Sequence, residues 1–173
     1  MRNIGLLVSR GIFGSYLAVH GAQKLFGSFG GHGLDATGAA FESMGLRPGR
    51  AMAAVAGASE FGGGVLTATG MADPLGPLAI AGTMVVASAV HRKQGPLAQK
   101  GGFELPLTNL ALAVGLLSTG AGRWRLGPRL PRGLTVVSSL VGTGMAAFSV
   151  SQLLRAKPSP PVASEPEGDP AAT

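Results

Sequence analysis

The amino-acid sequence predicts an all-α protein: a helical membrane bundle of four core transmembrane helices, followed by a fifth helix near the C-terminus. Three observations lead to this fold class. Charged residues make up only 13% of the 173-residue chain and hydrophobic residues 46%, whereas soluble domains carry about 25% charged residues. Five apolar segments approach the roughly 20 residues that span a bilayer. These segments are also rich in Gly, Ala and Ser, which allow membrane helices to pack closely.

The five apolar segments are separated by polar or glycine-rich connections. They cover residues 4–24, 51–70, 74–91, 105–122 and 133–154. The first contains Arg10, the second contains Glu60 as its one charge, and the third ends at His91. The third to fifth segments lack polar residues at every third or fourth position, so they have no face suited to water.

The same pattern divides the chain into three parts. Residues 1–126 form the four-helix core, residues 127–156 a basic loop with the additional hydrophobic helix, and residues 157–173 a tail. The tail is rich in Pro, Ala, Ser and acidic residues, which predicts disorder. Between the second and third segments, the sequence MADP predicts a tight turn. Small residues in the helices are candidates for close helix contacts, namely Gly57, Gly62, Gly63, Gly64, Gly142 and Gly144.

Composition excludes several classes of function. The net charge is +6, but the basic residues occur in short clusters and the chain has one Trp and one Tyr. A continuous basic face and an aromatic stacking surface are both missing, so nucleic-acid binding is excluded. The chain has no cysteine, which rules out disulfides, thiol nucleophiles and iron–sulfur clusters. A redox role would therefore need a bound cofactor or a partner protein. The two sides of the membrane carry five and eight Lys and Arg residues if the fifth segment spans, and seven and six if it does not, so membrane orientation stays open.

A small set of ionisable residues lies in or beside the apolar segments, and it forms the candidate polar pocket. The set comprises Arg10, His20, Lys24, Glu60, His91 and Glu104. Ionisable groups inside spans are costly and usually mark a functional site. At 100° per residue, Arg10 and Lys24 lie about 40° apart around the first helix, and His20 about 40° beyond Lys24. These three side chains therefore share one face.

The depths of these residues suggest how they pair. A second helix running antiparallel to the first favours a Glu60–Arg10 ion pair, and brings Lys24, His91 and Glu104 near the connection between the first two helices. Two interpretations remain open. One is a structural lock that fixes the register of otherwise featureless helices. The other is a pocket that binds a quinone-like head group or relays protons.

The glycine-rich stretch HGAQKLFGSFGGHG, residues 20–33, has three possible meanings. A phosphate-binding loop is excluded because no strand precedes it and no Gly-Lys-Ser/Thr follows. A metal site is weakly supported, because neither H-x-x-x-H nor H-E-x-x-H occurs, and no metal ligands are assigned. We interpret the stretch as the end of the first helix, with His20 and Lys24 facing the bundle interior and the glycines carrying the chain along the membrane surface.

Three longer runs resemble the DoxX family of small bacterial membrane proteins. They are HGAQKLFGSFGGHGLDATGAAFESMGLRPG, ASEFGGGVLTATG and AVHRKQGPLAQKGGFELPLTNLALAVGLLSTGAGRW, within residues 4–126. The most specific positions are His20-Gly21, Gln23-Lys24, Phe41-Glu42, Gly45-Leu46, Glu60, and Glu104 with Pro106 and Asn109-Leu110. The resemblance implies a four-helix, multi-pass protein of the bacterial plasma membrane. The family is named for its likeness to a subunit of thiosulfate:quinone oxidoreductase.

The resemblance therefore implies an accessory or subunit of a quinone-linked oxidoreductase or of a redox stress-defence complex. A membrane quinone is the implied cofactor, and soluble redox or detoxification proteins are the implied partners. No catalytic residue is assigned. Two alternatives remain open: a non-enzymatic scaffold that tethers soluble proteins to the bilayer, and a transporter of small molecules or lipids. The many small residues also allow a homo-oligomer.

Overall fold

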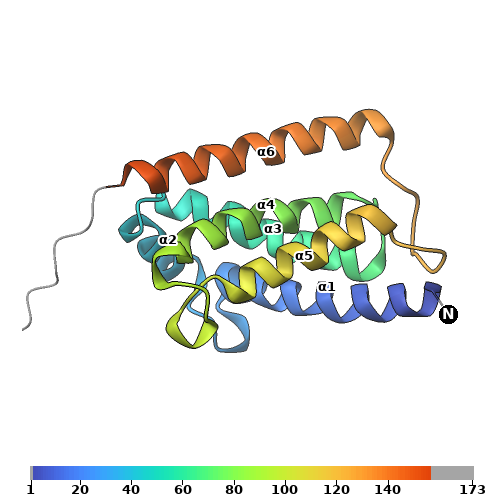
Figure 1. The fold of residues 1–173 in the computed structure, drawn as a ribbon, viewed down its shortest axis with the longest axis horizontal. Coiled ribbons are helices and arrows are strands. Elements are labelled where there is room, and N and C mark those ends of the chain that lie inside the picture. Colours follow the sequence, from blue (N-terminus) through green and yellow to red (C-terminus); the bar gives the residue numbers. More distant parts are fainter. Residues whose placement is uncertain (1, 157–173) are drawn as a thin grey trace, which may run out of the picture.

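The computed structural model describes residues 2–156, which contain six α-helices, three short 3₁₀-helices and no strand (Figure 1). The α-helices are α1 Arg2–Phe26, α2 Gly33–Ser43, α3 Gly49–Thr69, α4 Leu75–His91, α5 Glu104–Thr119 and α6 Arg132–Arg155. The 3₁₀-helices are η1 Ser28–Gly30, η2 Arg92–Gln94 and η3 Ala98–Lys100. The predicted disordered tail, residues 157–173, lies outside the described residues.

All five predicted apolar segments are helical, as α1, α3, α4, α5 and α6, which confirms the all-α class. The sequence analysis missed α2, because its eleven residues GLDATGAAFES mix glycine with polar side chains and show no long apolar stripe. Packing stabilises this helix. A methyl group added at Gly38 would come within 2.8 Å of Arg50 Cα, so α2 lies directly on the start of α3.

Two glycines with positive φ end the long helices and set the turns. Gly27 has φ 69° and follows the last residue of α1. Gly70 also has φ 69°, and its N–H donates to the carbonyl of Thr67 at the end of α3. Only glycine adopts this left-handed conformation without a steric cost, which makes it the usual helix terminator. The tight turn predicted at MADP is confirmed, since α3 ends at Thr69 and α4 begins at Leu75.

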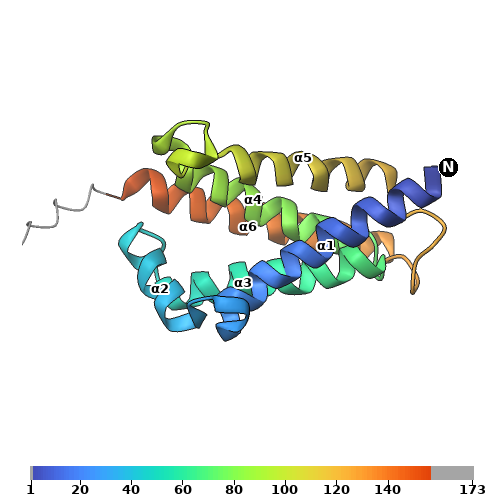
Figure 2. The same cartoon turned by 90° about the horizontal axis from the view of Figure 1, so that it is seen from below.

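Helices α1 and α3 run antiparallel and touch through glycines on both sides (Figure 2). Gly14 lies opposite Gly64, and a Cβ on Gly14 would sit 2.5 Å from the Gly64 carbonyl oxygen. Two turns along, a Cβ on Gly21 would sit 2.6 Å from the Gly57 carbonyl oxygen. Side chains cannot fit at such spacings, so the two backbones are in direct contact. This contact fixes the register of α1 on α3.

The glycines predicted to mediate helix contacts divide into two groups. Gly57 and Gly64 contact α1, and Gly63 faces the carbonyl of Gly76 on α4. The interpretation is wrong for Gly62 and Gly144, where an added Cβ would meet nothing within 4 Å, and these two glycines point away from the neighbouring helices. A Cβ on Gly142 would also meet nothing within 4 Å, but Gly142 lines the cavity described below, and its carbonyl oxygen lies 3.8 Å from the position of a Cβ on Gly82 of α4.

The packed core joins three helices, and much of the outer surface is apolar. The core cluster consists of Phe13, Leu17, Ile80, Met84, Ala113 and Leu116, from α1, α4 and α5. Large apolar side chains such as Ile12 on α1 and Leu140 on α6 are exposed. By length and composition, Leu75–Gln94 and Arg132–Arg155 suit a membrane span, and α5 is a shorter apolar helix. Helix α6 lies across the bundle from α1 (Figure 1).

A matched pair of substitutions tests the α1–α3 contact. Gly64→Ala adds a methyl group 2.5 Å from the Gly14 carbonyl oxygen, whereas Gly62→Ala adds one in open space on the same helix. We expect Gly64→Ala to destabilise the protein by roughly 1–3 kcal/mol through overpacking. Gly62→Ala should be neutral, or stabilise by up to about 1 kcal/mol through helix propensity. Unfolding in detergent measures both, and equal stabilities of the two variants would contradict the contact.

Candidate functional site

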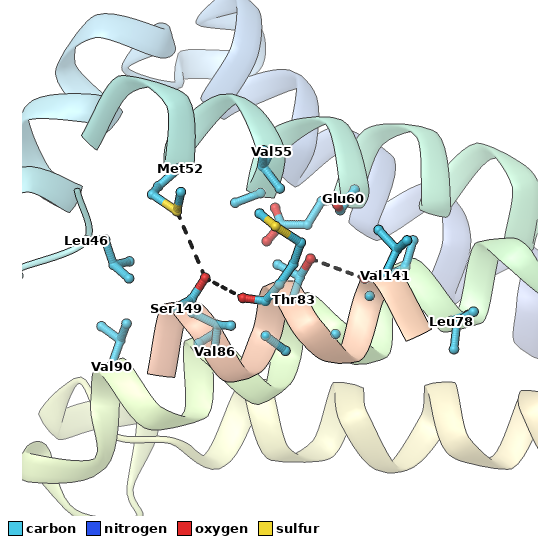
Figure 3. A pocket seen from close by; sticks show the side chains of 18 of the residues that line it. Leu46, Met52, Val55, Glu60, Leu78, Thr83, Val86, Val90, Val141 and Ser149 are labelled. Carbon is cyan, nitrogen blue, oxygen red and sulfur yellow. Dashed lines mark hydrogen bonds between the residues drawn. The ribbon is translucent and has the colours of Figure 1, made fainter. Parts of the chain in front are cut away.

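A cavity of about 530 Å³ lies between α3, α4 and α6 (Figure 3). Its α3 and α4 walls are mostly aliphatic, and α6 closes the third side. The residues from α6 are Val137, Ser138, Val141, Gly142, Met145, Ala146 and Ser149. Phe41, Met44 and Leu46, around the end of α2, close the cavity at one end. The volume falls within the roughly 300–1,000 Å³ typical of small-molecule sites.

Polar side chains are sparse in this cavity. Those in its lining are Lys24, Ser59, Glu60, Thr83, His91, Ser138 and Ser149. The Thr83 hydroxyl donates to the carbonyl of Ala79 at 3.2 Å, and the Ser149 hydroxyl to that of Met145 at 2.8 Å. These bonds lie within helices and use the one hydrogen of each hydroxyl, so these two groups could only accept a hydrogen bond from a ligand. Across residues 2–156, the hydroxyls of Ser59 and Ser138 have no polar partner, so both can bond a bound molecule.

Among the described residues, Lys24 and Glu60 form the only ion pair in the cavity wall. Lys24 Nζ donates to Glu60 Oε2, joining the end of α1 to the middle of α3. The Glu60 side chain is only 5% exposed and that of Lys24 is 27% exposed. Glu60 points from α3 into the space facing α6 (Figure 3). Among the residues that the structure describes, Lys24 is the only residue that forms a hydrogen bond or an ion pair with Glu60.

The predicted Glu60–Arg10 ion pair is wrong, and the helix register explains why. With Gly14 opposite Gly64 and Gly21 opposite Gly57, Lys24 lies nearer than Arg10 to Glu60 along the helix axis. Arg10 lies instead beside the end of α3. It is only 2% exposed and donates to the carbonyl oxygens of Ala68 at 2.9 Å and Thr67 at 3.4 Å. These carbonyls belong to the last helical turn, where a cation is favoured.

A second, smaller hollow adjoins the ion pair from the other side. This recess, of about 320 Å³, lies between the end of α1, η1 and α2. Its lining includes His20, Gln23, Lys24, His32 and Thr37. The His20 ring packs edge-on against Tyr16 with the ring centroids 4.5 Å apart. Lys24 lines both hollows, whereas Glu60 lines the cavity and not the recess.

The last two candidate residues lie in and beside the α4–α5 connection. His91 lines the cavity, and its Nδ1 is 2.7 Å from the carbonyl oxygen of Gly101. Glu104 accepts a hydrogen bond from the Ala98 N–H at 2.9 Å and lines neither hollow. The structure therefore brings Lys24, Glu60 and His91 to the cavity and His20 to the adjoining recess. Arg10 and Glu104 lie elsewhere.

Helix α6 is fixed over the cavity by polar contacts near its C-terminal end. The Gln152 side-chain amide makes two hydrogen bonds with the backbone of Arg47, each 2.7 Å long. Ser149 lies 3.9 Å from the sulfur of Met52 (Figure 3). The sequence analysis missed Ser59, Ser138 and Gln152 as site residues. Only Ser59 carried a local signal, as the neighbour of Glu60.

A model of the DoxX family matches residues 5–92, just over half of the 173-residue chain. The chain belongs to the DoxX family. This match confirms the resemblance drawn from the sequence, and the protein is therefore a membrane protein of that family. The matched segment contains the Lys24–Glu60 pair and both the α3 and α4 walls, and it ends before α5 and α6. No curated protein and no solved structure matches the chain.

The arrangement in this DoxX-family protein suits an amphipathic molecule. Aliphatic walls would bury an apolar chain, and the ion pair with its neighbouring hydroxyls would hold a polar head group. Within residues 2–156, no three His, Asp or Glu side chains gather as a metal site requires. The chemistry of the site thus centres on Glu60, Lys24 and the two unpaired hydroxyls.

Removing one member of the ion pair should destabilise the protein strongly. Lys24→Met leaves the Glu60 carboxylate buried without a partner, so we expect a loss of about 3 kcal/mol. Adding Glu60→Gln to Lys24→Met removes the remaining charge and should restore most of that loss. As a control, Arg50→Met breaks the exposed Arg50–Asp35 pair, which should cost less than about 1 kcal/mol. Unfolding of the four proteins in detergent provides the comparison, and a Lys24→Met protein as stable as Arg50→Met would refute the burial argument.

Proposed function

We propose that this DoxX-family protein is a multi-pass protein of the bacterial plasma membrane that binds a membrane quinone in the cavity between α3, α4 and α6. In this proposal it acts as an accessory or subunit of a quinone-linked oxidoreductase. The observation that carries the proposal is the cavity itself: a chamber of about 530 Å³ with aliphatic walls and one buried ion pair. A quinone has the matching shape, since a polar head group is attached to an apolar chain.

The position of the cavity supports a ligand that dissolves in the bilayer. One complete wall comes from α6, whose outer side carries exposed apolar residues such as Leu140 and Phe148. A molecule in the lipid would therefore reach the cavity beside α6 without crossing water. The head-group end is marked by Lys24 and Glu60, because charged groups in a low-dielectric setting attract polar partners most strongly.

The absence of native cysteine allows a direct test of the membrane placement. Leu140 on α6 is 69% exposed and lies outside the cavity, and Leu126 and Leu97, in connections at opposite ends of the bundle, are 73% and 52% exposed. We expect a single cysteine at Leu126 or Leu97 to react with a membrane-impermeant maleimide in membrane vesicles made permeable to it. A cysteine at Leu140 should stay unreactive, because lipid covers it. Equal reaction at all three positions would exclude a spanning α6.

In intact cells, the same two connection variants test the number of spans. If α5 spans the membrane, Leu97→Cys and Leu126→Cys lie on opposite sides, and the impermeant reagent labels only one of them. Labelling of both, or protection of both until the cells are opened, would contradict a spanning α5.

Filling the cavity should expel the quinone. Ala146 lines the cavity, whereas its neighbour Ala147 is exposed on the outside of α6. We expect Ala146→Phe to lower the quinone retained after purification in mild detergent at least tenfold, and Ala147→Phe to leave it unchanged. Extraction and chromatographic quantification of the quinone provide the measurement. Wild-type protein that retains no quinone above a detergent-micelle control, and binds none when it is added, would overturn the proposal.

A further inference from the structure

The two members of the ion pair differ in what surrounds their unused bonding positions. Lys24 Nζ donates one hydrogen bond to Glu60 Oε2. The Lys24 side chain also lines the polar recess, where water can accept hydrogen bonds from its other N–H groups. Glu60 lines the cavity but not the recess. Its second oxygen, Oε1, receives no hydrogen bond from the described residues. Oε1 is therefore a carboxylate oxygen that is free to accept a hydrogen bond from a donor in the cavity.

A carboxylate in an ion pair can only accept hydrogen bonds. An accepting oxygen on the ligand would repel Glu60 Oε1, whereas a hydroxyl would donate to it. The hydroxyls of Ser59 and Ser138 can either donate or accept, so they do not distinguish the two kinds of head group. Lys24 and His91 also line the cavity, but Lys24 Nζ is held by Glu60 and His91 Nδ1 by the carbonyl oxygen of Gly101. Discrimination in this cavity thus falls on Glu60 Oε1.

Building on the quinone proposal above, we infer that the cavity is selective for the reduced form, the quinol, over the quinone. The quinol carries two phenolic hydroxyl groups, and one of them donates to Glu60 Oε1. The quinone has two carbonyl oxygens in the same places and offers no donor. The inference makes Glu60 the residue that determines specificity for the redox state of the ligand, with Lys24 holding it in position.

Binding of matched redox pairs tests this inference. The probes are decylubiquinone and a short-chain menaquinone, each titrated as quinone and as quinol under argon into the detergent-solubilised protein. Wild-type protein should bind each quinol at least about tenfold more tightly than its quinone, since a hydrogen bond to a charged group is worth roughly that factor or more. Equal affinities, or tighter binding of the quinones, would overturn the inference and leave quinone-pool binding intact. No binding of either form would instead overturn the underlying proposal.

Variants separate the role of Glu60 from a general effect of charge. Glu60→Gln keeps the shape but supplies an amide N–H, so the preference for quinol should disappear or reverse. Asp73→Asn is the matched control, because Asp73 is another buried carboxylate, pairs with Arg129 at 3.6 Å and lies outside the cavity. The control should keep the wild-type preference. If Glu60→Gln does not fold, Lys24→Met combined with Glu60→Gln replaces it. A preference that survives loss of the Glu60 carboxylate would contradict the assignment.

Discussion

The backbone contact between α1 and α3 determines where the buried charges of this protein lie. Gly14 and Gly21 on α1 face Gly64 and Gly57 on α3, with no space for a side chain between them. Gly14 and Gly21 are seven residues apart on α1, and Gly57 and Gly64 are seven residues apart on α3. Each glycine therefore recurs on the same face of its helix after about two turns. This contact prevents the helices from sliding by even one turn. The register in turn brings Lys24 to Glu60 and Arg10 to the last carbonyls of α3.

In the proposal above, the ion pair serves both as a structural lock and as part of a binding site, the two interpretations that the sequence left open. As a structural lock, Lys24–Glu60 connects α1 to α3 beside the Gly21–Gly57 contact. As a site, the same Glu60 faces the cavity that α4 and α6 complete. The two roles are compatible because a carboxylate has two oxygens, and the lock occupies only Oε2. The other oxygen, Oε1, borders the cavity, where a bound molecule can donate a hydrogen bond to it.

Sequence patterns were enough to predict the five long helices, because each apolar segment is close to its final length. They also identified Glu60 and Lys24, since isolated charges in apolar helices stand out. Pairing could not be predicted, because it depends on a register set by Gly14 and Gly21, which have no side chains to form a pattern. Helix α2 was missed for a related reason: its stability comes from the fit of Gly38 against Arg50 and not from its own composition. Ser138 and Gln152 were beyond prediction because only the position of α6 makes them significant.

Part of the cavity wall comes from the segment that matches the DoxX family, and part comes from α6, which lies outside that match. Residues 5–92, which match DoxX, supply the ion pair and the α3 and α4 walls. The wall from α6 lies outside that match, yet it contributes seven of the lining residues, including Ser138. Without α6 the ion pair would still form, because none of its contacts involve that helix, but the cavity would open on one side. In the proposed site, the charged groups for the head group therefore come from the matched segment, whereas α6 supplies the Ser138 hydroxyl and encloses the apolar chain. Helix α6 is held by Gln152 near its C-terminal end, so the wall that separates the cavity from lipid is joined to the α2–α3 connection through the backbone of Arg47.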